Sequence, residues 1–280
     1  MRKRHLPAAL VCLIALFLAA AQPLWAKVYQ TVDQSLSLPV APLAVAVSGD
    51  GNVTFVLGPD GKVLVSTKAG ERDEITIGKD FDQIATTFTG DKIVVSSRKT
   101  KQLQSIYVDF LKHLTTDGSP FLGNDKAPLV LVSFSDFQCP HCAKLGAVYQ
   151  QLLEKYPNSL KIVYKYFPLP NHQFSGLAAV AAVAAGKQGK FWQYHDLIYA
   201  NFDSLTPEKI NQFAEKLGLN MPQFQKDMNS QEAKDRVIRD LEEGRAAGVL
   251  GTPTLFLNGR MVRDHSLAGI EKMIDETRKK

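Results

Sequence analysis

The chain has 280 residues, of which 45% are hydrophobic and 22% charged. This composition is typical of one or two globular domains and excludes a disordered or fibrous protein. The formal net charge is +5, but Arg2, Lys3 and Arg4 lie at the extreme N-terminus. The rest of the chain is nearly neutral and lacks the clustered Lys and Arg of a nucleic-acid-binding face. We therefore expect no nucleic-acid partner.

Residues 1–26 have the layout of a secretory signal peptide. Met1–His5 is cationic, Leu6–Ala21 contains no charged residue, and Leu24-Trp25-Ala26 ends in a small residue. The apolar run of about 16 residues is shorter than the roughly 20 that a membrane-spanning helix needs. We therefore favour cleavage near Ala26, with Ala21 as the alternative, over a permanent anchor. The mature protein is expected to be periplasmic or otherwise exported.

Residues 27–114 predict a small antiparallel β-rich module in two similar halves. Its Gly-Asp turns, Gly49-Asp50 and Gly90-Asp91, are 41 residues apart, a spacing found between propeller blades. Two blades cannot close a ring, so we favour a compact antiparallel domain. No reactive side chains gather in this segment, and we expect it to contact a partner or to dimerise the protein. The predicted strands are 43–48, 53–57, 62–66, 84–88, 92–96 and 102–107.

Residues 112–126 read as a polar connector, and the pattern then changes to that of an α/β domain with a mixed sheet. Apolar runs at 129–134 and 160–167 predict buried strands on either side of a helix at 143–156. An insertion at about 174–245 is mainly helical, and a hairpin and a last helix follow it. The expected elements of this part are helices at 178–185, 191–199, 207–217, 222–229 and 231–247, hairpin strands at 254–257 and 261–262, and a helix at 267–279.

The mature chain retains two cysteines, in Cys139-Pro140-His141-Cys142. A disulfide across so short a loop adds little stability, so a redox role is favoured over a structural one. A zinc site would need a second pair of ligands, and a c-type haem site would need His where Ala143 stands. The motif therefore indicates a dithiol redox centre that uses no metal and no organic cofactor.

The predicted position of the motif, between a buried strand and a helix, suits this chemistry. Cys139 would lie at the helix N-terminus, where free N–H groups and the helix dipole stabilise a thiolate. Pro140 and His141 are expected to tune the pair, and His141 can supply a hydrogen bond or a positive charge. Cys142, one turn further into the helix, is expected to be the more buried, resolving thiol.

Two motifs together, Phe134-Ser135-Asp136-Phe137-Gln138-Cys139-Pro140-His141-Cys142 and Gly251-Thr252-Pro253-Thr254, resemble those of the DsbA-like thiol:disulfide oxidoreductases of the thioredoxin superfamily. The resemblance covers about residues 115–280. It implies a thioredoxin-like fold with a helical insertion, a Cys139–Cys142 disulfide as the catalytic pair, and a cis bond between Thr252 and Pro253. Those two residues would face the cysteines and bind an extended substrate through the backbone.

The sequence departs from the family pattern beneath the cysteines. Many thioredoxin relatives carry a buried carboxylate where this chain has Ser133, so the resemblance does not extend to a carboxylate proton relay. Asp136 is nearer to the cysteines and could serve such a relay or act as a turn or cap residue. Lys165, on the adjacent strand, could approach the site or could lie in solvent.

The resemblance implies an exported enzyme that exchanges its disulfide with the thiols of reduced or misfolded exported proteins. The favoured activity is that of a dithiol oxidase, reset by a membrane-bound or soluble redox partner. Two alternatives stay open at this point. One is an isomerase or reductase that residues 27–114 dimerise. The other is a non-catalytic thioredoxin-like binding protein, against which the paired cysteines argue.

Overall fold

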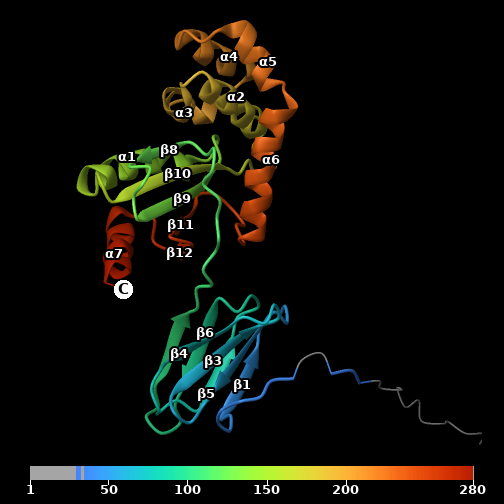
Figure 1. Cartoon of the computed structure of the whole chain (residues 1–280), viewed down its shortest axis with the longest axis vertical. Helices are drawn as coiled ribbons and strands as arrows, with labels where there is room; N and C mark the ends of the chain where they lie inside the picture. Colours follow the sequence, from blue (N-terminus) through green and yellow to red (C-terminus); the bar gives the residue numbers. More distant parts are fainter. Residues whose placement is uncertain (1–29, 33–34, 280) are drawn as a thin grey trace, which may run out of the picture.

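A computed structural model describes residues 30–32 and 35–279 of the chain (Figure 1). The expected signal peptide and its cleavage site lie outside the described residues. Within residues 30–32 and 35–279, no helix has both the length and the apolar character needed to cross a membrane. A β-rich module comes first along the chain, and an α/β unit with a helical insertion follows.

The N-terminal module consists of two antiparallel sheets that share one core. The first sheet has the order β1-β2-β3-β4 and the second β5-β6-β7. Phe55 and Val63 of the first sheet pack in the same cluster as Ile93 and Val95 of the second, so the two halves form one unit rather than separate blades. The strands are β1 (Ala44–Val47), β2 (Val53–Leu57), β3 (Lys62–Thr67), β4 (Arg72–Thr76), β5 (Gln83–Thr86), β6 (Lys92–Ser96) and β7 (Leu103–Tyr107).

The α/β unit is built on a five-stranded mixed sheet of order β12-β11-β9-β10-β8. Strands β9 and β10 are parallel, and the other pairings are antiparallel. Strand β8 lies inside the predicted connector, which is therefore not wholly irregular. The strands are β8 (Phe121–Gly123), β9 (Leu129–Ser135), β10 (Leu160–Tyr166), β11 (Thr254–Leu257) and β12 (Arg260–Val262).

Helices cover both faces of this sheet. Helices α1 (Pro140–Lys155) and α7 (Leu267–Arg278) pack on the face that carries Leu131, and the end of α6 (Gln231–Ala246) packs on the face that carries Val132. Neighbouring residues of β9 therefore point to opposite layers, as a strand buried on both faces requires. This arrangement confirms the thioredoxin-like α/β architecture that the sequence predicts.

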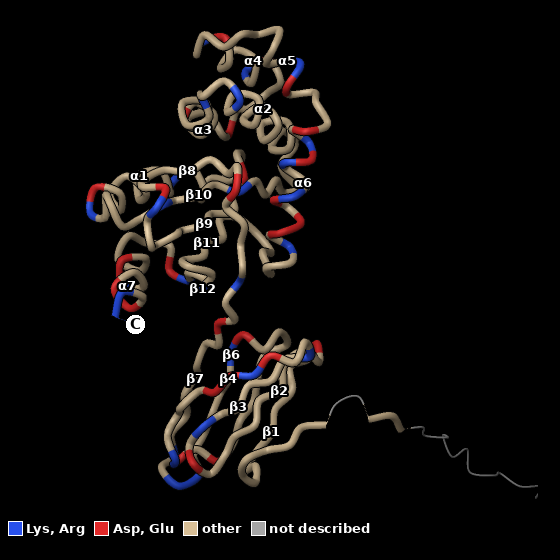
Figure 2. The backbone as a smooth tube through the Cα atoms, in the orientation of Figure 1, with Lys and Arg blue, Asp and Glu red and all other residues tan. Residues whose placement is uncertain are grey.

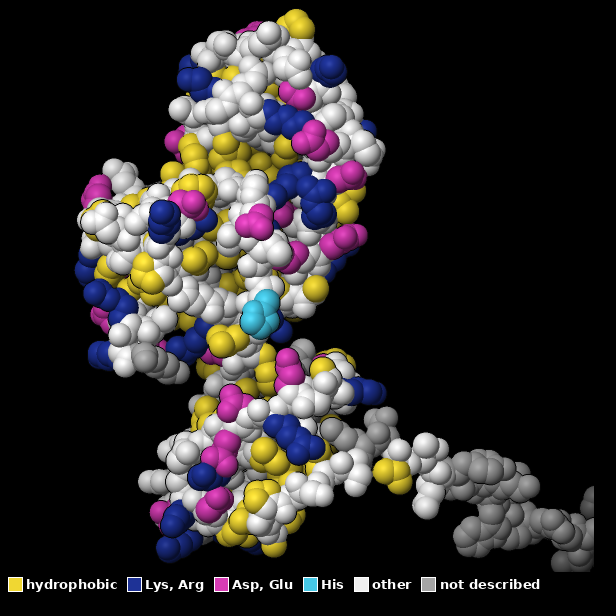
Figure 3. Space-filling view, in the orientation of Figure 1, with side chains coloured by type: hydrophobic (Ala, Val, Ile, Leu, Met, Phe, Trp, Pro, Cys, Tyr) yellow, Lys and Arg dark blue, Asp and Glu magenta, His cyan; other side chains and the backbone are white. Residues whose placement is uncertain are grey.

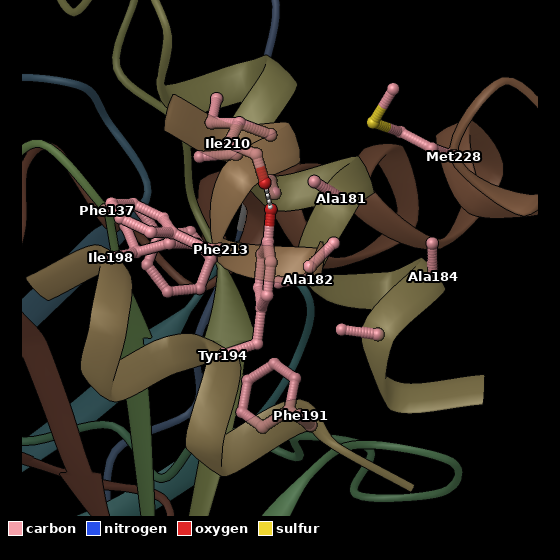
Figure 4. Packing of buried hydrophobic residues seen from close by; sticks show 14 of the residues in the cluster. Phe137, Ala181, Ala182, Ala184, Phe191, Tyr194, Ile198, Ile210, Phe213 and Met228 are labelled. Atoms are coloured by element: carbon pink, nitrogen blue, oxygen red, sulfur yellow. Dashed lines mark hydrogen bonds between the residues drawn. The ribbon is translucent and has the colours of Figure 1, made fainter. Parts of the chain in front are cut away.

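The helical insertion has a core of its own, which continues onto the sheet. Its alanine-rich helix α2 is buried on several sides, and the Tyr194 hydroxyl donates a hydrogen bond of 2.8 Å to the Ile210 carbonyl at the centre (Figure 4). Apolar side chains are visible where the insertion meets the sheet (Figure 3). Its elements are α2 (Ser175–Lys187), α3 (Phe191–Tyr199), a short 3-10 turn (Phe202–Ser204), α4 (Pro207–Lys216) and α5 (Met221–Met228).

The β module is joined to the α/β unit at β12. Asp109 forms ion pairs with Arg260, at 2.9 Å, and with Arg263. The Arg263 guanidinium also lies 4.2 Å from the ring centre of Tyr107, and the Lys112 N–H donates to the Gly259 carbonyl at 2.8 Å.

Charged residues of both signs are spread along the rest of the backbone (Figure 2).

Candidate active site

The two cysteines lie where β9 passes into α1. Cys139 is the residue before the helix, and its carbonyl accepts the first helical hydrogen bond, from the N–H of Ala143, at 3.1 Å. Pro140 occupies the first turn, where a missing N–H costs nothing. Pro140 and His141 are exposed, so both are accessible beside the sulfur atoms. The strand–helix placement that the sequence predicts for the motif is thus the placement found.

Both cysteines are free thiols, so the geometry is that of the dithiol form of the pair. Each side chain is 4% exposed. The solvent-exposed fraction therefore does not distinguish the two residues. Burial nevertheless acts most strongly on the Cys142 thiol, as expected for the more deeply placed sulfur, whereas hydrogen bonds dominate at Cys139.

The environment separates the pKa values of the two thiols. A hydrogen bond from the Cys142 thiol lowers the pKa of Cys139 to about 5, helped by Thr252 and by the backbone N–H groups of Cys142 and His141. Burial, reinforced by the neighbouring Cys139, raises the pKa of Cys142 instead. At neutral pH the dithiol form therefore contains one thiolate, at Cys139, and one thiol, at Cys142.

The loop before β11 faces Cys139. The Thr252–Pro253 peptide bond is cis, as the family resemblance implies. The Thr252 carbonyl lies 3.2 Å from Cys139 Sγ and accepts a hydrogen bond when Cys139 is a thiol. The buried Thr252 hydroxyl makes no hydrogen bond to any nitrogen or oxygen of the described residues, so it can donate to the sulfur once Cys139 is a thiolate. The pairing of Thr254 with Phe134 holds this loop beside the cysteines.

Asp136 fixes the loop that leads to Cys139, and its predicted turn role is confirmed. The carboxylate is 1% exposed and accepts hydrogen bonds of 2.6 Å from the N–H groups of Gln138 and Leu169. The Nδ1 atom of His172 lies 3.0 Å from the same carboxylate. The sequence gives no sign of this last contact, because His172 lies 36 residues further along the chain.

A chain of hydroxyl groups replaces the family carboxylate. The Tyr149 hydroxyl donates to Ser133 at 2.7 Å, and Ser133 shares a hydrogen bond of 2.8 Å with Ser135. All three side chains are buried. The helical spacing of Tyr149 predicts only a core residue. The hydrogen bond of its hydroxyl to Ser133 depends on the tertiary fold, so the sequence pattern does not reveal it. The group beneath the cysteines is therefore neutral.

The expectation that Lys165 could lie in solvent is wrong, and its ammonium group is held by acidic side chains of α6. It is 1% exposed and pairs with Asp240 at 3.1 Å and with Glu243 at 2.8 Å, both on α6. Its ammonium also donates to the Thr115 hydroxyl at 3.3 Å. Lys165 therefore anchors α6 and the residues before β8 to the central sheet.

Residues 30–32 and 35–279 contain no group of three or more His, Cys, Asp or Glu side chains that could hold a metal ion. Cys139 and Cys142 supply the reactive sulfur atoms of the site. A strand–helix–strand unit with a dithiol at the helix start, faced by a cis-proline loop, defines a protein of the thioredoxin-fold dithiol class.

Comparison with known proteins agrees with this class. The sequence model of the thioredoxin family matches residues 115–276, which is more than half of the chain. The chain therefore belongs to the thioredoxin family.

Solved structures with the same fold include a thioredoxin-like oxidoreductase, BdbD and a thiol-disulfide exchange protein. A thioredoxin-like oxidoreductase from Silicibacter pomeroyi DSS-3 is 27% identical, with a TM-score of 0.52, over 59% of this chain and 94% of that one. BdbD from Bacillus subtilis, in its oxidised form, is 19% identical with a TM-score of 0.56, over 61% and 99%. The thiol-disulfide exchange protein alpha-DsbA2 from Wolbachia pipientis is 22% identical with a TM-score of 0.51, over 57% and 87%.

Curated relatives include sodium/proton antiporters, to which the similarity is partial. The chain is 34% identical over 167 residues to Na(+)/H(+) antiporter NhaA 3 of Salinispora tropica and 35% identical over 141 residues to NhaA of Herminiimonas arsenicoxydans. The matches cover 59% and 50% of this chain, but the chain spans only 25% and 22% of the antiporters. The similarity is therefore to one part of those proteins and does not carry over their transport activity.

The separated thiol pKa values predict how alkylation depends on pH. In the dithiol form, the rate at which iodoacetamide modifies Cys139 should rise through about pH 5 and then level off, because only the thiolate reacts. Cys142→Ala should move this midpoint upward toward about 8.5, the value of an ordinary thiol, because the principal hydrogen bond is lost. Cys142→Ser, which retains a donor, should lie between the two. A midpoint near 8.5 in the wild-type protein would contradict the assignment of Cys139 as the thiolate.

Proposed function

We propose that this protein is an exported dithiol oxidase that transfers its Cys139–Cys142 disulfide to the thiols of reduced or misfolded exported proteins. The observation that carries the proposal is the lowered pKa of Cys139, to about 5, beside the raised pKa of Cys142. A stabilised Cys139 thiolate favours the reduced form of the enzyme. The oxidised enzyme is then a strong acceptor of electrons from its clients.

The exchange proceeds in two steps. A client thiolate attacks Cys139 Sγ in the oxidised enzyme, the Cys139–Cys142 bond breaks, and Cys142 leaves and takes up a proton. A second client thiolate then attacks the client sulfur of the mixed disulfide, and Cys139 leaves as a stabilised thiolate. The client loses two electrons and gains a disulfide, and the enzyme becomes the dithiol. No metal or organic cofactor takes part.

We assign further roles to the residues around the pair. Pro140 and His141 tune the redox properties of the two cysteines, and Thr252 and Pro253 present backbone to an extended client. A membrane-bound or soluble redox partner restores the disulfide after each cycle. The cationic and apolar sequence of residues 1–26 supports export, with cleavage near Ala26.

A second candidate is an isomerase or reductase that the β module joins into a homodimer. Strand β1 favours it, because Val45 and Val47 point outward and are 53% and 55% exposed. Apolar side chains on the outer face of an edge strand are a suitable contact for a second copy. In this form two dithiol sites would act on one misfolded client.

The reduction potential of the cysteine pair separates the two candidates. We expect equilibration with glutathione buffers to give an oxidising value, nearer to about −120 mV than to the about −270 mV of thioredoxin. The measurement is the fraction of dithiol, read from alkylated protein at each buffer ratio, with Cys142→Ser as the control that cannot close the disulfide. A value near −270 mV, together with a dimeric mass in solution, would favour the isomerase or reductase instead.

A further inference from the structure

Leu250 is an apolar side chain that stands almost wholly in solvent. It is 95% exposed, more than any other large hydrophobic residue of the described chain. The residue before it, Val249, is 3% exposed and packs in the core. The chain therefore turns Leu250 outward at a point where its neighbour is firmly buried.

Leu250 lies on the loop that faces the reacting sulfur. It lies two residues before Thr252, whose carbonyl is 3.2 Å from Cys139 Sγ. Two trans peptide units span at most about 7.6 Å between Cα atoms, so the Leu250 backbone lies close to the residue that contacts Cys139. Pro140 and His141 are exposed on the helix side of the same sulfur.

The loop holds Leu250 in place from both sides. On one side, the N–H groups of Gly248 and Val249 donate to the carbonyls of Arg245 and Gly244, at 3.0 and 2.8 Å. On the other side, the Thr254 hydroxyl donates to the Gly251 carbonyl at 2.8 Å. These bonds fix the backbone that carries Leu250, so little backbone freedom is lost when a partner covers the side chain.

We propose that Leu250 determines client specificity by packing against an apolar side chain next to the client cysteine. The inference rests on the proposed function, because it concerns the same exchange at Cys139. The partner is an extended segment of an unfolded protein, in which apolar residues are accessible, rather than a small thiol. Covering the two apolar side chains removes both from water while the client sulfur reaches Cys139.

The test compares two peptide dithiols that differ only in whether leucine or serine flanks the reacting cysteine. For Leu250→Ser, we expect kcat/KM with the leucine peptide to fall about tenfold, as for one apolar contact, through a higher KM. The serine peptide and dithiothreitol should be oxidised at nearly the wild-type rate. Leu250→Met should retain the wild-type preference for the leucine peptide over the serine peptide. The control is Leu103→Ser, in a leucine of the β module that is 68% exposed, and it should leave this preference unchanged.

Equal rates for both peptides in wild-type protein, or an equal loss for both in Leu250→Ser, would overturn the proposal. So would a lower solution mass of Leu250→Ser, which would place Leu250 in a contact between copies of this chain. Failure of the oxidase function itself would look different, because the wild-type protein would then oxidise neither peptide nor dithiothreitol.

Discussion

Cys142→Ser should convert the protein into a trap that remains covalently joined to its clients, whereas Cys139→Ser should not react with them. The Cys139 thiolate of the Cys142→Ser protein can attack a disulfide of a client, so that one client sulfur leaves as a thiolate and the other stays bound to Cys139. The internal thiol that would release this mixed disulfide is missing. In Cys139→Ser the remaining thiol at Cys142 is buried and its pKa is raised, so almost none of it is ionised at neutral pH.

The measurement is oxidation of a reduced peptide, together with non-reducing electrophoresis of client mixtures. We expect the peptide-oxidising activity of both variants to fall to the uncatalysed rate, and slower bands to appear with Cys142→Ser alone. Ser97→Ala, a change in a buried hydroxyl of the β module, serves as the matched control and should retain the wild-type rate. Mixed disulfides formed by Cys139→Ser and not by Cys142→Ser would reverse the assignment of the attacked sulfur.

Asp240→Ala should destabilise the protein by about 3–5 kcal/mol, the range for removing one partner of a buried ion pair. Asp240 is 2% exposed and lies between Lys165 and Arg236. It also accepts a hydrogen bond of 3.1 Å from the Tyr166 N–H. Burial raises the pKa of Asp240, and the two cations oppose that shift. Without the carboxylate, the buried Lys165 retains Glu243 as its one acidic partner.

Denaturant unfolding of the dithiol protein measures this loss. Glu242→Ala is the control, because Glu242 is the exposed acidic residue two positions along the same helix, and its replacement should cost no more than about 0.5 kcal/mol. Equal midpoints for Asp240→Ala and Glu242→Ala would show that Asp240 is not needed to hold α6 on the sheet.

The parts of the fold that follow from local pattern are predictable from the sequence. Apolar runs mark β9 and β10, helical spacing marks α1, and proline in the first turn marks the starts of α4 and α5. Strands β4 and β8 are not predicted, because neither has the apolar pattern or the length by which a strand is recognised in a sequence. Strand β4 reads Arg72-Asp73-Glu74-Ile75-Thr76, with four of its five side chains exposed, and β8 has only three residues.

The candidate site divides in the same way. The Cys139-Pro140-His141-Cys142 motif and the Thr252-Pro253 pair are visible because each is a short, specific string. The partners of Lys165, by contrast, come from α6, 75 residues away in the sequence for Asp240. No periodicity relates β10 to a helix that returns after an insertion. Such polar contacts therefore require the fold.

The unequal ionisation of the two cysteines has a consequence for protons as well as electrons. Between about pH 5 and the pKa of ordinary client thiols, near about 8.5, the reduced pair carries one proton and two client thiols bring two. Each disulfide given to a client thus liberates one proton into the surrounding solution. The equilibrium for client oxidation therefore shifts tenfold toward the disulfide for every unit by which the pH rises. The acidity of the compartment then sets how far this enzyme drives its clients toward their folded, cross-linked state.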